Sequence, residues 1–405
     1  MITEVWRGVW DPRVPRYDLD PIKELVAMNT PEVRTCNRCV MDTTAAEIEF
    51  DADGVCSFCR QFEAKAHRVL RPDHDSRQRR LDQLVNEVRK RGKGKPYDCV
   101  VGVSGGVDSS WVLVNAVRMG LRPLAVHMDN GWNSELAQNN IANLVRGLGV
   151  DLYTHVIDWP EYRGLMQAFF DADVIDIELL YDNAMLAVNC QQAHRIGTRA
   201  ILSGTNHATE GLRMPSDWYW CKLDRRNIRA LGARNGIRLK TFPAIGTGRY
   251  VWNTVVRRLC WVWFLDYLDY NKSEAIAELQ AGFAYKPYPY KHYESVFTRF
   301  YQGYILPEKF GVDKRRVHFS SLIISNQMTR EQAMEGLKGM PYPSEEALEA
   351  DKTYFVKKMG WTRAQLDDYI RRPAKAHSDF PSESGLFDAC VRIRKMLTGS
   401  GGRQG

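Results

Sequence analysis

Residues 98–110, DCVVGVSGGVDSS, decide the fold that we expect for this chain. Residues 99–103 are apolar apart from one glycine and predict a short buried strand. The strand breaks at two glycines, and the Asp-Ser-Ser sequence that follows opens an apolar-periodic helix. Backbone N–H groups and the helix dipole converge at such a turn, where glycine lets a phosphate approach the backbone. The sequence therefore predicts an anion cradle; the alternative is a glycine turn that binds nothing.

The glycine turn resembles the SGGxDS loop of the PP-loop superfamily, whose members are also called N-type ATP pyrophosphatases. It is not a Walker A loop, because the Gly-Lys-Ser/Thr ending is absent. Members of the superfamily activate an oxygen atom by adenylylation and release pyrophosphate. The resemblance implies that ATP is bound and that its pyrophosphate portion is held by Ser104, Gly105, Gly106, Val107, Asp108, Ser109 and Ser110.

Strand-like and helix-like segments alternate over residues 96–246. Further strands are predicted at 124–128, 151–157 and 200–202, and helices at 134–148 and 178–196. This alternation is typical of an α/β fold with a parallel sheet covered by helices on both faces. Ligands of such sheets bind at the carboxyl ends of the strands, so we expect the polar loops 104–110, 129–132 and 203–210 to surround one crevice.

Four of the nine cysteines form two CxxC pairs, with sixteen residues between the inner cysteines. Two residues between thiolates let both sulfurs reach one ion, and four thiolates close a tetrahedral zinc site. The sequence therefore predicts a zinc module over residues 36–60, and the alternatives are a redox dithiol or an iron–sulfur cluster. The expected ligands are Cys36, Cys39, Cys56 and Cys59.

Composition favours a soluble protein of two or more domains, with 405 residues, 44% hydrophobic and 26% charged. The net charge of +7 suits a phosphate-bearing ligand or an acidic partner and does not require nucleic acid. The first 17 residues lack the apolar core of a signal peptide, and the apolar stretch 259–268 is too short to insert into a membrane. The scattered cysteines argue against a disulfide scaffold, so we expect a cytoplasmic location.

Outside the sheet, we expect an extended or disordered arm over residues 1–35 and a basic linker helix over 61–95. That helix is either a solvated connection or a face that contacts RNA. Residues 247–397 predict a helical C-terminal region that includes an aromatic helix at 252–270. The tryptophans of this helix are interpreted as core or interface residues rather than as a base-stacking surface. A flexible, glycine-rich tail is expected at 398–405.

Six segments of the chain carry a more specific signal: CxxC, CxxC, SGGVDSS, DNGWNS, SGTNHATEG and the long block that begins KHYESVFTRFYQGYILPEKFG. Taken in this order, they resemble the N-acetyl sugar amidotransferase family. The resemblance covers residues 34–337 and is most specific in the last block. These enzymes act in bacterial surface-polysaccharide (lipopolysaccharide O-antigen) and nonulosonic-acid pathways. The resemblance implies that the amide oxygen of an N-acetyl sugar, expected to be nucleotide-linked, is adenylylated by ATP, after which ammonia displaces AMP and leaves an acetamidino sugar.

The resemblance also implies roles for single residues. Asp108 and Glu210 are expected to bind magnesium, and Asn206 stands where related synthetases carry an Asp, which puts a direct acid role there in doubt. Further nucleotide contacts are expected from Asp129, Asn130, Gly204, Thr205 and Asn206. The last block offers Lys291 and Arg299 for anionic groups and His292 or Glu294 for proton transfer; the alternative is a surface turn before a salt-bridged helix.

The ammonia source is expected to be a separate glutaminase subunit, of the type paired with imidazole glycerol phosphate synthase. Met1 is followed by Ile2, so no N-terminal cysteine nucleophile is expected, and no triad-like Cys and His-x-Glu pattern is present. Two alternative hypotheses remain. One is a tRNA-thiolating PP-loop enzyme, which would need a further cysteine such as Cys190 or Cys221, and the other is a zinc-bearing scaffold that binds nucleotide without turning it over.

Overall fold

The computed structural model describes residues 33–288 and 293–398 of the chain. The chain divides into a unit that ends at Arg34 and a second unit that begins at Thr35, and the description below concerns the second unit. Most of the predicted N-terminal arm, nearly all of the predicted tail, and the candidate residues Lys291 and His292 lie outside the described residues.

Five parallel strands form one sheet in the order β3-β2-β1-β4-β5, which confirms the predicted α/β fold. The chain runs outward from β1 through β2 to β3 and then crosses to the other side of β1 with β4. The order therefore reverses beside β1, and ligands of open parallel sheets bind where the order reverses. The strands are β1 (Cys99–Gly102), β2 (Pro123–Asp129), β3 (Leu152–Val156), β4 (Ala200–Ser203) and β5 (Cys260–Trp263).

The side chains of β1 alternate between two hydrophobic cores, one on each face of the sheet. Cys99 and Val101 pack with one set of helices, whereas Val100 packs with the other. Successive strand residues point to opposite faces, so a strand buried on both faces is apolar throughout, as the sequence predicted. The helices that flank these strands are α4 (Val107–Arg118), α5 (Glu135–Leu148), α6 (Trp159–Asp171), α7 (Leu179–Arg195), α8 (His207–Glu210), α9 (Arg225–Arg234) and α11 (Lys272–Phe283).

The predicted aromatic helix at residues 252–270 is wrong. The strand pairing shows instead that this stretch returns to the sheet, where β5 pairs with β4. Arg258 has φ 55°, a left-handed conformation that ends the preceding helical turns, and the Cys-Trp-Val-Trp sequence of β5 suits a strand. Trp252 is half exposed rather than a core residue. The elements around β5 are α10 (Thr247–Val251), the π-helix η1 (Trp252–Val256) and the 3-10 helix η2 (Phe264–Tyr267).

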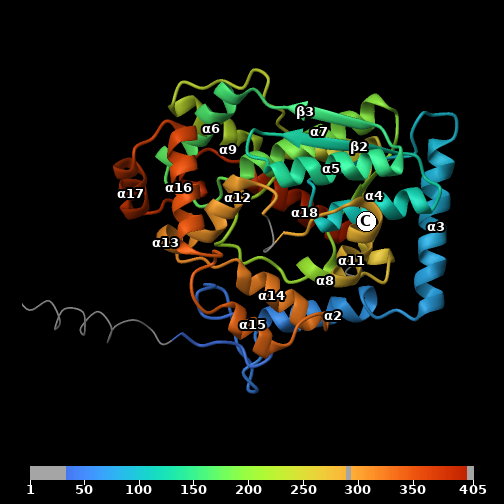
Figure 1. Ribbon diagram of the computed structural model, residues 1–405, viewed down its shortest axis with the longest axis horizontal. Helices are drawn as coiled ribbons and strands as arrows, with labels where there is room; N and C mark the ends of the chain where they lie inside the picture. The colour runs from blue at the N-terminus through green and yellow to red at the C-terminus, as the bar shows by residue number, and fades with distance from the viewer. Residues whose placement is uncertain (1–32, 289–292, 399–405) are drawn as a thin grey trace, which may run out of the picture. The chain divides into compact units, whose positions relative to one another are not determined.

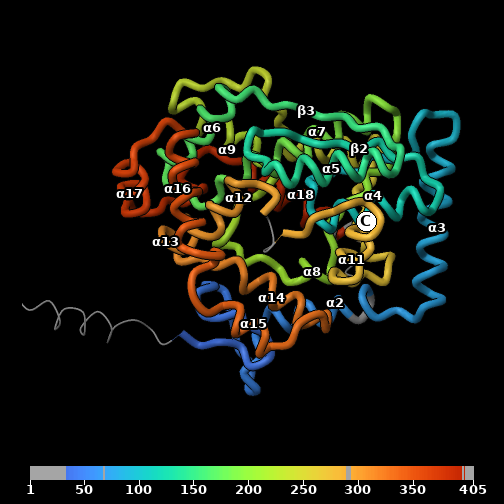
Figure 2. Tube along the Cα trace, in the orientation of Figure 1, coloured from blue at the N-terminus to red at the C-terminus, as the bar shows by residue number. Residues whose placement is uncertain are grey.

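The predicted linker helix at residues 61–95 is two helices rather than one. α2 (Ser57–Val69) begins inside the segment 36–60 that carries the two CxxC pairs, called the cysteine module below. α3 (His74–Gly92) follows after a break that contains Pro72. Proline lacks the N–H of a helix interior and restricts the residue before it, which explains the break. Figure 2 shows α3 running along one flank of the molecule, apart from α2.

The cysteine module packs against the C-terminal helices α14 (Arg315–Ile324) and α15 (Arg330–Gly336). Arg316 donates a hydrogen bond to the carbonyl of Val40 (2.8 Å), and Arg330 donates to the carbonyls of Cys36 (3.0 Å) and Cys39 (3.2 Å). Figures 1 and 2 show α2, α14 and α15 side by side. The remaining C-terminal elements are α12 (Val296–Phe300), the π-helix η3 (Tyr301–Ile305), α13 (Leu306–Phe310), α16 (Glu345–Met359), α17 (Arg363–Arg371), the 3-10 helix η4 (His377–Asp379) and α18 (Ser384–Thr398).

A search of the described residues for a helix that is both long and apolar enough to cross a membrane finds none.

Candidate active site

The glycine turn after β1 forms a cradle without side chains. Gly105 has φ +85°, and a Cβ atom on it would lie 2.7 Å from the carbonyl oxygen of Ala137. A Cβ on Gly204, in the neighbouring loop, would lie 2.9 Å from the backbone N of Ser109. At Gly105, where a close backbone approach combines with positive φ, only glycine fits, and at Gly204 the close approach alone excludes a side chain. The α4 N-terminus then presents its N–H groups to a space kept open for a phosphate chain.

Ser104 and Ser109 close the turn by hydrogen bonds within it. The Ser109 hydroxyl accepts a hydrogen bond from the Ser104 N–H (3.2 Å), and the Ser104 hydroxyl accepts one from Gly106 N–H (3.2 Å). Because these bonds fix the loop before any ligand binds, the cradle is preorganised.

A cavity of about 560 Å³ opens between the ends of β1 and β4, where the strand order of the sheet reverses. Its lining gathers most of the predicted ATP contacts: Ser104, Gly106, Val107, Asp108, Ser109, Gly204 and Thr205. The predicted magnesium ligand Glu210 and the proton-transfer candidate Glu294 line it as well. Two loops that are a hundred residues apart in the sequence thus meet at one site, as the parallel sheet predicts.

Asp108 is held by a residue that the sequence did not suggest. The buried phenol of Tyr270 donates a hydrogen bond to Asp108 Oδ1. Burial and then the charge of Asp108 raise the pKa of Tyr270 well above its usual range, so the phenol stays a donor. Tyr270 therefore orients a carboxylate that lines the phosphate cavity.

Glu294 reaches the glycine turn from the C-terminal region. Its carboxylate lies so close to Gly106 that a Cβ there would be 2.1 Å from Glu294 Oε1. Its backbone carbonyl accepts a hydrogen bond from Ser134 N (2.8 Å), and Val296 N donates to Trp132 O (2.8 Å). These backbone bonds tie the C-terminal block to the loop after β2.

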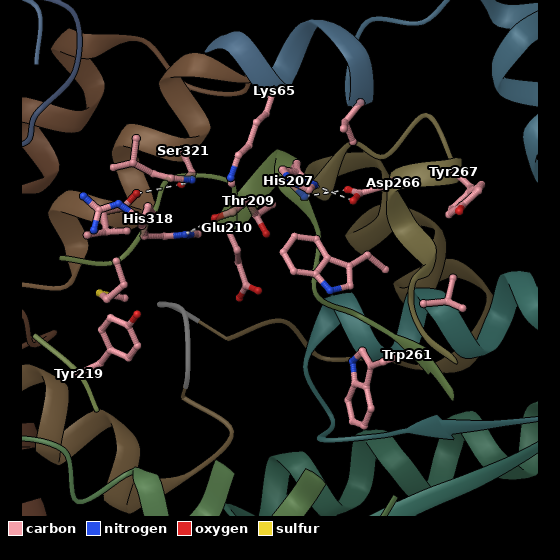
Figure 3. A pocket seen from close by; sticks show the side chains of 18 of the residues that line it. Lys65, His207, Thr209, Glu210, Tyr219, Trp261, Asp266, Tyr267, His318 and Ser321 are labelled. Atoms are coloured by element: carbon pink, nitrogen blue, oxygen red, sulfur yellow. Dashed lines mark hydrogen bonds and ion pairs between the residues drawn. The ribbon is translucent and has the colours of Figure 1, made fainter. Parts of the chain in front are cut away.

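A second, larger cavity of about 1370 Å³ adjoins the first. The two share four lining residues, of which only Glu210 and His318 carry titratable side chains; the others are Trp261 and Phe319. His318, on α14, is hydrogen-bonded through Nδ1 to the carbonyl of Thr209 (3.1 Å), the residue before Glu210. Figure 3 shows Glu210 extending into the larger cavity, with His318 at its edge. The boundary between the cavities therefore combines a carboxylate and an imidazole with two aromatic rings.

Not all predicted nucleotide contacts reach the cavity. Asp129 accepts hydrogen bonds from Gly131 N (2.8 Å) and Asn133 Nδ2 (3.2 Å), and Asn130 accepts one from Trp132 N (3.1 Å). Both side chains are engaged in their own turn, and neither residue lines the cavity. Ser110 is buried, and Asn206 caps α8 through Thr209 N (2.8 Å).

Arg299 lines the larger cavity, but its charge is already paired. Its Nε and Nη2 donate to the two oxygens of Asp351 at 2.6 and 2.5 Å. The same carboxylate also accepts a hydrogen bond from the Tyr342 hydroxyl (2.7 Å). Such a bidentate pair positions the helix that bears Arg299, as the alternative of a salt-bridged helix predicts.

The four predicted zinc ligands lie together and are fully buried. Their sulfur atoms all fall within 4.8 Å of one another. Sγ of Cys36 also accepts hydrogen bonds from the N–H groups of Arg38 (3.4 Å) and Cys56 (3.3 Å). Side-chain hydrogen bonds from Cys39, Cys56 and Cys59 lower the pKa of the Cys36 thiol far below its usual range. Four converging sulfurs, with amides that stabilise thiolate, could hold zinc.

Sequence reasoning missed several residues that build the site. Tyr288 donates a hydrogen bond to the carbonyl of Gly105 (3.1 Å), and Asn140 Nδ2 donates to the carbonyl of Lys286 (2.9 Å). Lys65 and His318 line the larger cavity, and Tyr270 donates a hydrogen bond to Asp108 in the smaller one. The aromatic segment that includes residues 286–288 is unusual in the sequence, but only the fold shows that Lys286 and Tyr288 lie beside the glycine turn and α5.

Comparisons with known proteins match two parts of the chain. A family model described as NAD synthase matches residues 77–213, and one described as LPS biosynthesis protein WbpG-like, C-terminal domain, matches residues 294–395. A GMP synthase (glutamine-hydrolyzing) from Pyrobaculum aerophilum is 36% identical over 90 residues, which cover 22% of this chain and 16% of that protein. This chain thus spans less than a fifth of that relative's length.

Two solved structures are also similar. The NH3-dependent NAD synthetase from Campylobacter jejuni shares 15% identity over 51% of this chain and 93% of its own, with a TM-score of 0.27. The NMN synthetase from Francisella tularensis shares 14% identity over 54% of this chain and 99% of its own, with a TM-score of 0.28.

The fold and the site define an ATP-using α/β enzyme domain of the NAD synthase type. Residues 77–213 are thus similar to NAD synthase and residues 294–395 to the WbpG-like C-terminal domain, and both matches support the predicted resemblance to the N-acetyl sugar amidotransferase family.

Proposed function

We propose that this chain is an ATP-dependent amidotransferase of lipopolysaccharide biosynthesis that converts the acetamido group of an N-acetyl sugar to an acetamidino group. The observation that carries the proposal is the pair of adjoining cavities that meet at Glu210 and His318. The smaller cavity has the phosphate cradle, and the larger one has room for a sugar with its carrier. A reaction between ATP and a second substrate needs such a meeting point.

The chemistry explains why ATP is required. The amide carbon resists ammonia until its oxygen becomes a good leaving group. The amide oxygen attacks the α-phosphorus, the bond to the bridging oxygen breaks, and pyrophosphate leaves. Ammonia then attacks the imidate carbon, loses protons, and the carbon–oxygen bond breaks to release AMP.

The residues of the chain act on this reaction mainly through electrostatics. The N–H groups of residues 104–107 and the hydroxyl groups of Ser104 and Ser109 would donate to the pyrophosphate portion. Asp108 and Glu210 offer hard carboxylate oxygens in the same cavity, which fits Mg²⁺. Bound there, the ion would neutralise charge on the departing pyrophosphate.

The ammonia supply belongs to the proposal as well: we expect a separate glutaminase subunit. Burial raises the pKa of Cys190 and of Cys221 to about 11, so neither thiol is activated as a nucleophile. Neither residue lines the ATP cavity. The same observations give the tRNA-thiolation alternative no support.

The test is turnover of the full chain with ATP, Mg²⁺ and ammonium over a panel of nucleotide-linked N-acetyl sugars. We expect pyrophosphate release that depends on one sugar, and a product lighter by the exchange of oxygen for NH. Glutamine in place of ammonium should give product only with an added glutaminase. Pyrophosphate release with transfer of sulfur to tRNA, or no release with any sugar, would contradict the proposal.

A further inference from the structure

The larger cavity is lined by eight cationic side chains: Lys65, Arg80, Arg91, Arg213, Arg299, Lys314, Arg315 and Arg394. Five of them form ion pairs with carboxylates of the chain at 2.5–3.0 Å. These pairs are Arg91–Glu87, Arg213–Glu47, Arg299–Asp351, Lys314–Glu178 and Arg315–Asp313. A cation that is already neutralised by the protein has little charge left for a ligand.

Lys65 differs from the others. Arg80 lies over the ring of Tyr267 (5.2 Å), and Arg394 has an interaction of its own. Within residues 33–288 and 293–398, Lys65 alone among these cations has no hydrogen bond, no ion pair and no ring contact. Figure 3 shows its side chain extending from α2 into the cavity, towards the segment that carries Thr209 and Glu210.

The backbone that carries Lys65 is rigidly placed. Cys59, one of the four clustered cysteines, lies on α2 six residues before Lys65. One turn before Lys65, the fully buried Phe62 packs so tightly on Gly211 that a Cβ there would be 2.1 Å from the ring. Gly211 follows Glu210 directly. The cysteine module therefore sets the position of Lys65 relative to the boundary between the two cavities.

From this arrangement we infer that Lys65 binds an anionic group of the acceptor, and that the cysteine module thereby forms part of the acceptor site. The inference rests on the proposed function, because it assigns the larger cavity to the acceptor. Two sources would supply such an anion: the phosphate through which the sugar is carried, or a carboxylate on the sugar itself. An ammonium group on a flexible stem pairs with either.

Binding of three probes to the full chain tests the inference, with the ATP cavity saturated by α,β-methylene ATP. The probes are UDP-N-acetylglucosamine, which offers phosphates; N-acetylneuraminic acid, which offers a carboxylate; and N-acetylglucosamine, which is neutral. Calorimetry compares wild type with Lys65→Met, Lys65→Arg and the control Lys357→Met, an exposed lysine on α16.

We expect one anionic probe to bind wild type and to bind Lys65→Met about tenfold more weakly or worse, with partial recovery in Lys65→Arg. The probe that responds identifies phosphate or carboxylate. Lys357→Met and the affinity for α,β-methylene ATP should not change. Equal affinity of wild type and Lys65→Met for both anionic probes would overturn the inference, as would wild-type binding of neither anion above the neutral sugar. Lys65-dependent binding without pyrophosphate release on adding ATP, Mg²⁺ and ammonium would instead count against the proposed reaction alone.

Discussion

The carboxylate of Glu294 lies against the α-carbon of Gly106, where any side chain would meet it at 2.1 Å. Glu294 is the first residue of the WbpG-like segment, and Gly106 is the N-cap of the helix that opens the phosphate cradle. The two matched parts of the chain therefore share one site, and a substitution at their contact reports on both.

For Gly106→Ala we expect ATP affinity to fall about tenfold or more, because the new methyl group enters the cradle and displaces the Glu294 carboxylate. Stability should change little, since φ −79° at Gly106 suits alanine. Titration with ATP and thermal unfolding measure the two quantities. The control is Gly282→Ala on α11, where nothing lies within 4 Å. Unchanged ATP affinity in Gly106→Ala would show that the phosphates lie elsewhere.

Glu210→Gln tests the residue where the two cavities meet. The amide keeps the shape but loses the charge that would hold Mg²⁺, so we expect sugar-dependent pyrophosphate release to fall about a hundredfold. Fold and acceptor binding should persist. Glu335→Gln, on the exposed end of α15, is the matched control. Normal pyrophosphate release by Glu210→Gln would show that Glu210 does not bind the metal.

Metal analysis and chelation test the four cysteines. We expect one zinc per chain and a clear loss of thermal stability when it is removed, because four buried thiols would be left without their ion. Cys56→Ser should lose the metal, whereas Cys390→Ser, remote in sequence and partly exposed, should keep it. Iron and sulfide in place of zinc would favour the iron–sulfur alternative.

The Arg299–Asp351 pair predicts a structural effect. Asp351 is buried, so Arg299→Ala leaves a carboxylate without its main partner and should lower the free energy of unfolding by about 2–3 kcal/mol. Arg299→Ala with Asp351→Asn should recover part of that loss. The exposed pair Arg363–Glu349 is the control, and Arg363→Ala should cost under about 1 kcal/mol. Full stability with lost turnover in Arg299→Ala would instead support a role with the acceptor.

His377 predicts how stability depends on pH. Burial lowers its pKa to about 4, with Nδ1 bonded to Asn227 Oδ1 (2.8 Å) and Nε2 accepting from Asp176 N (3.3 Å). An unfolded histidine titrates near 6.5, so the unfolded state takes up the proton first as pH falls. The part of the free energy of unfolding that depends on His377 is therefore highest above about pH 6.5. It decreases by a total of about 3 kcal/mol as the pH falls to about 4. Chemical unfolding across this range should show a shallower slope in His377→Gln, and an identical slope would exclude His377 as the cause.

The sequence predicted the parts of the fold that local chemistry determines. The glycine turn, four strands and the cysteine cluster each depend on residue types at short spacing, and the structure contains them all. β5 was missed because a Cys-Trp-Val-Trp segment flanked by aromatic residues shows no period that separates a short strand from a helix.

The residues of the candidate site likewise fall into those that the sequence predicted and those that it did not. The sheet rule alone predicted that the loops after β1 and β4 lie together, whereas the hydrogen bonds that hold Asp129 in its own turn could not be predicted. Tyr270 and Lys65 could not be predicted, because each reaches the site from an element whose placement depends on long-range packing. The proposed roles of Lys291 and His292 remain predictions.

β5 has a consequence for how the molecule can be divided. The last strand of the sheet is contributed after residue 259, beyond the segment in which the ATP loops lie. A fragment that ended at residue 246 would keep every predicted ATP contact up to Asn206, yet it would leave the apolar edge of β4 uncovered, and such an edge invites association with other chains. We therefore expect a fragment that ends at residue 246 to associate with other chains, and a fragment that continues beyond Tyr270, and so includes β5, to be the better unit for exchange between related proteins.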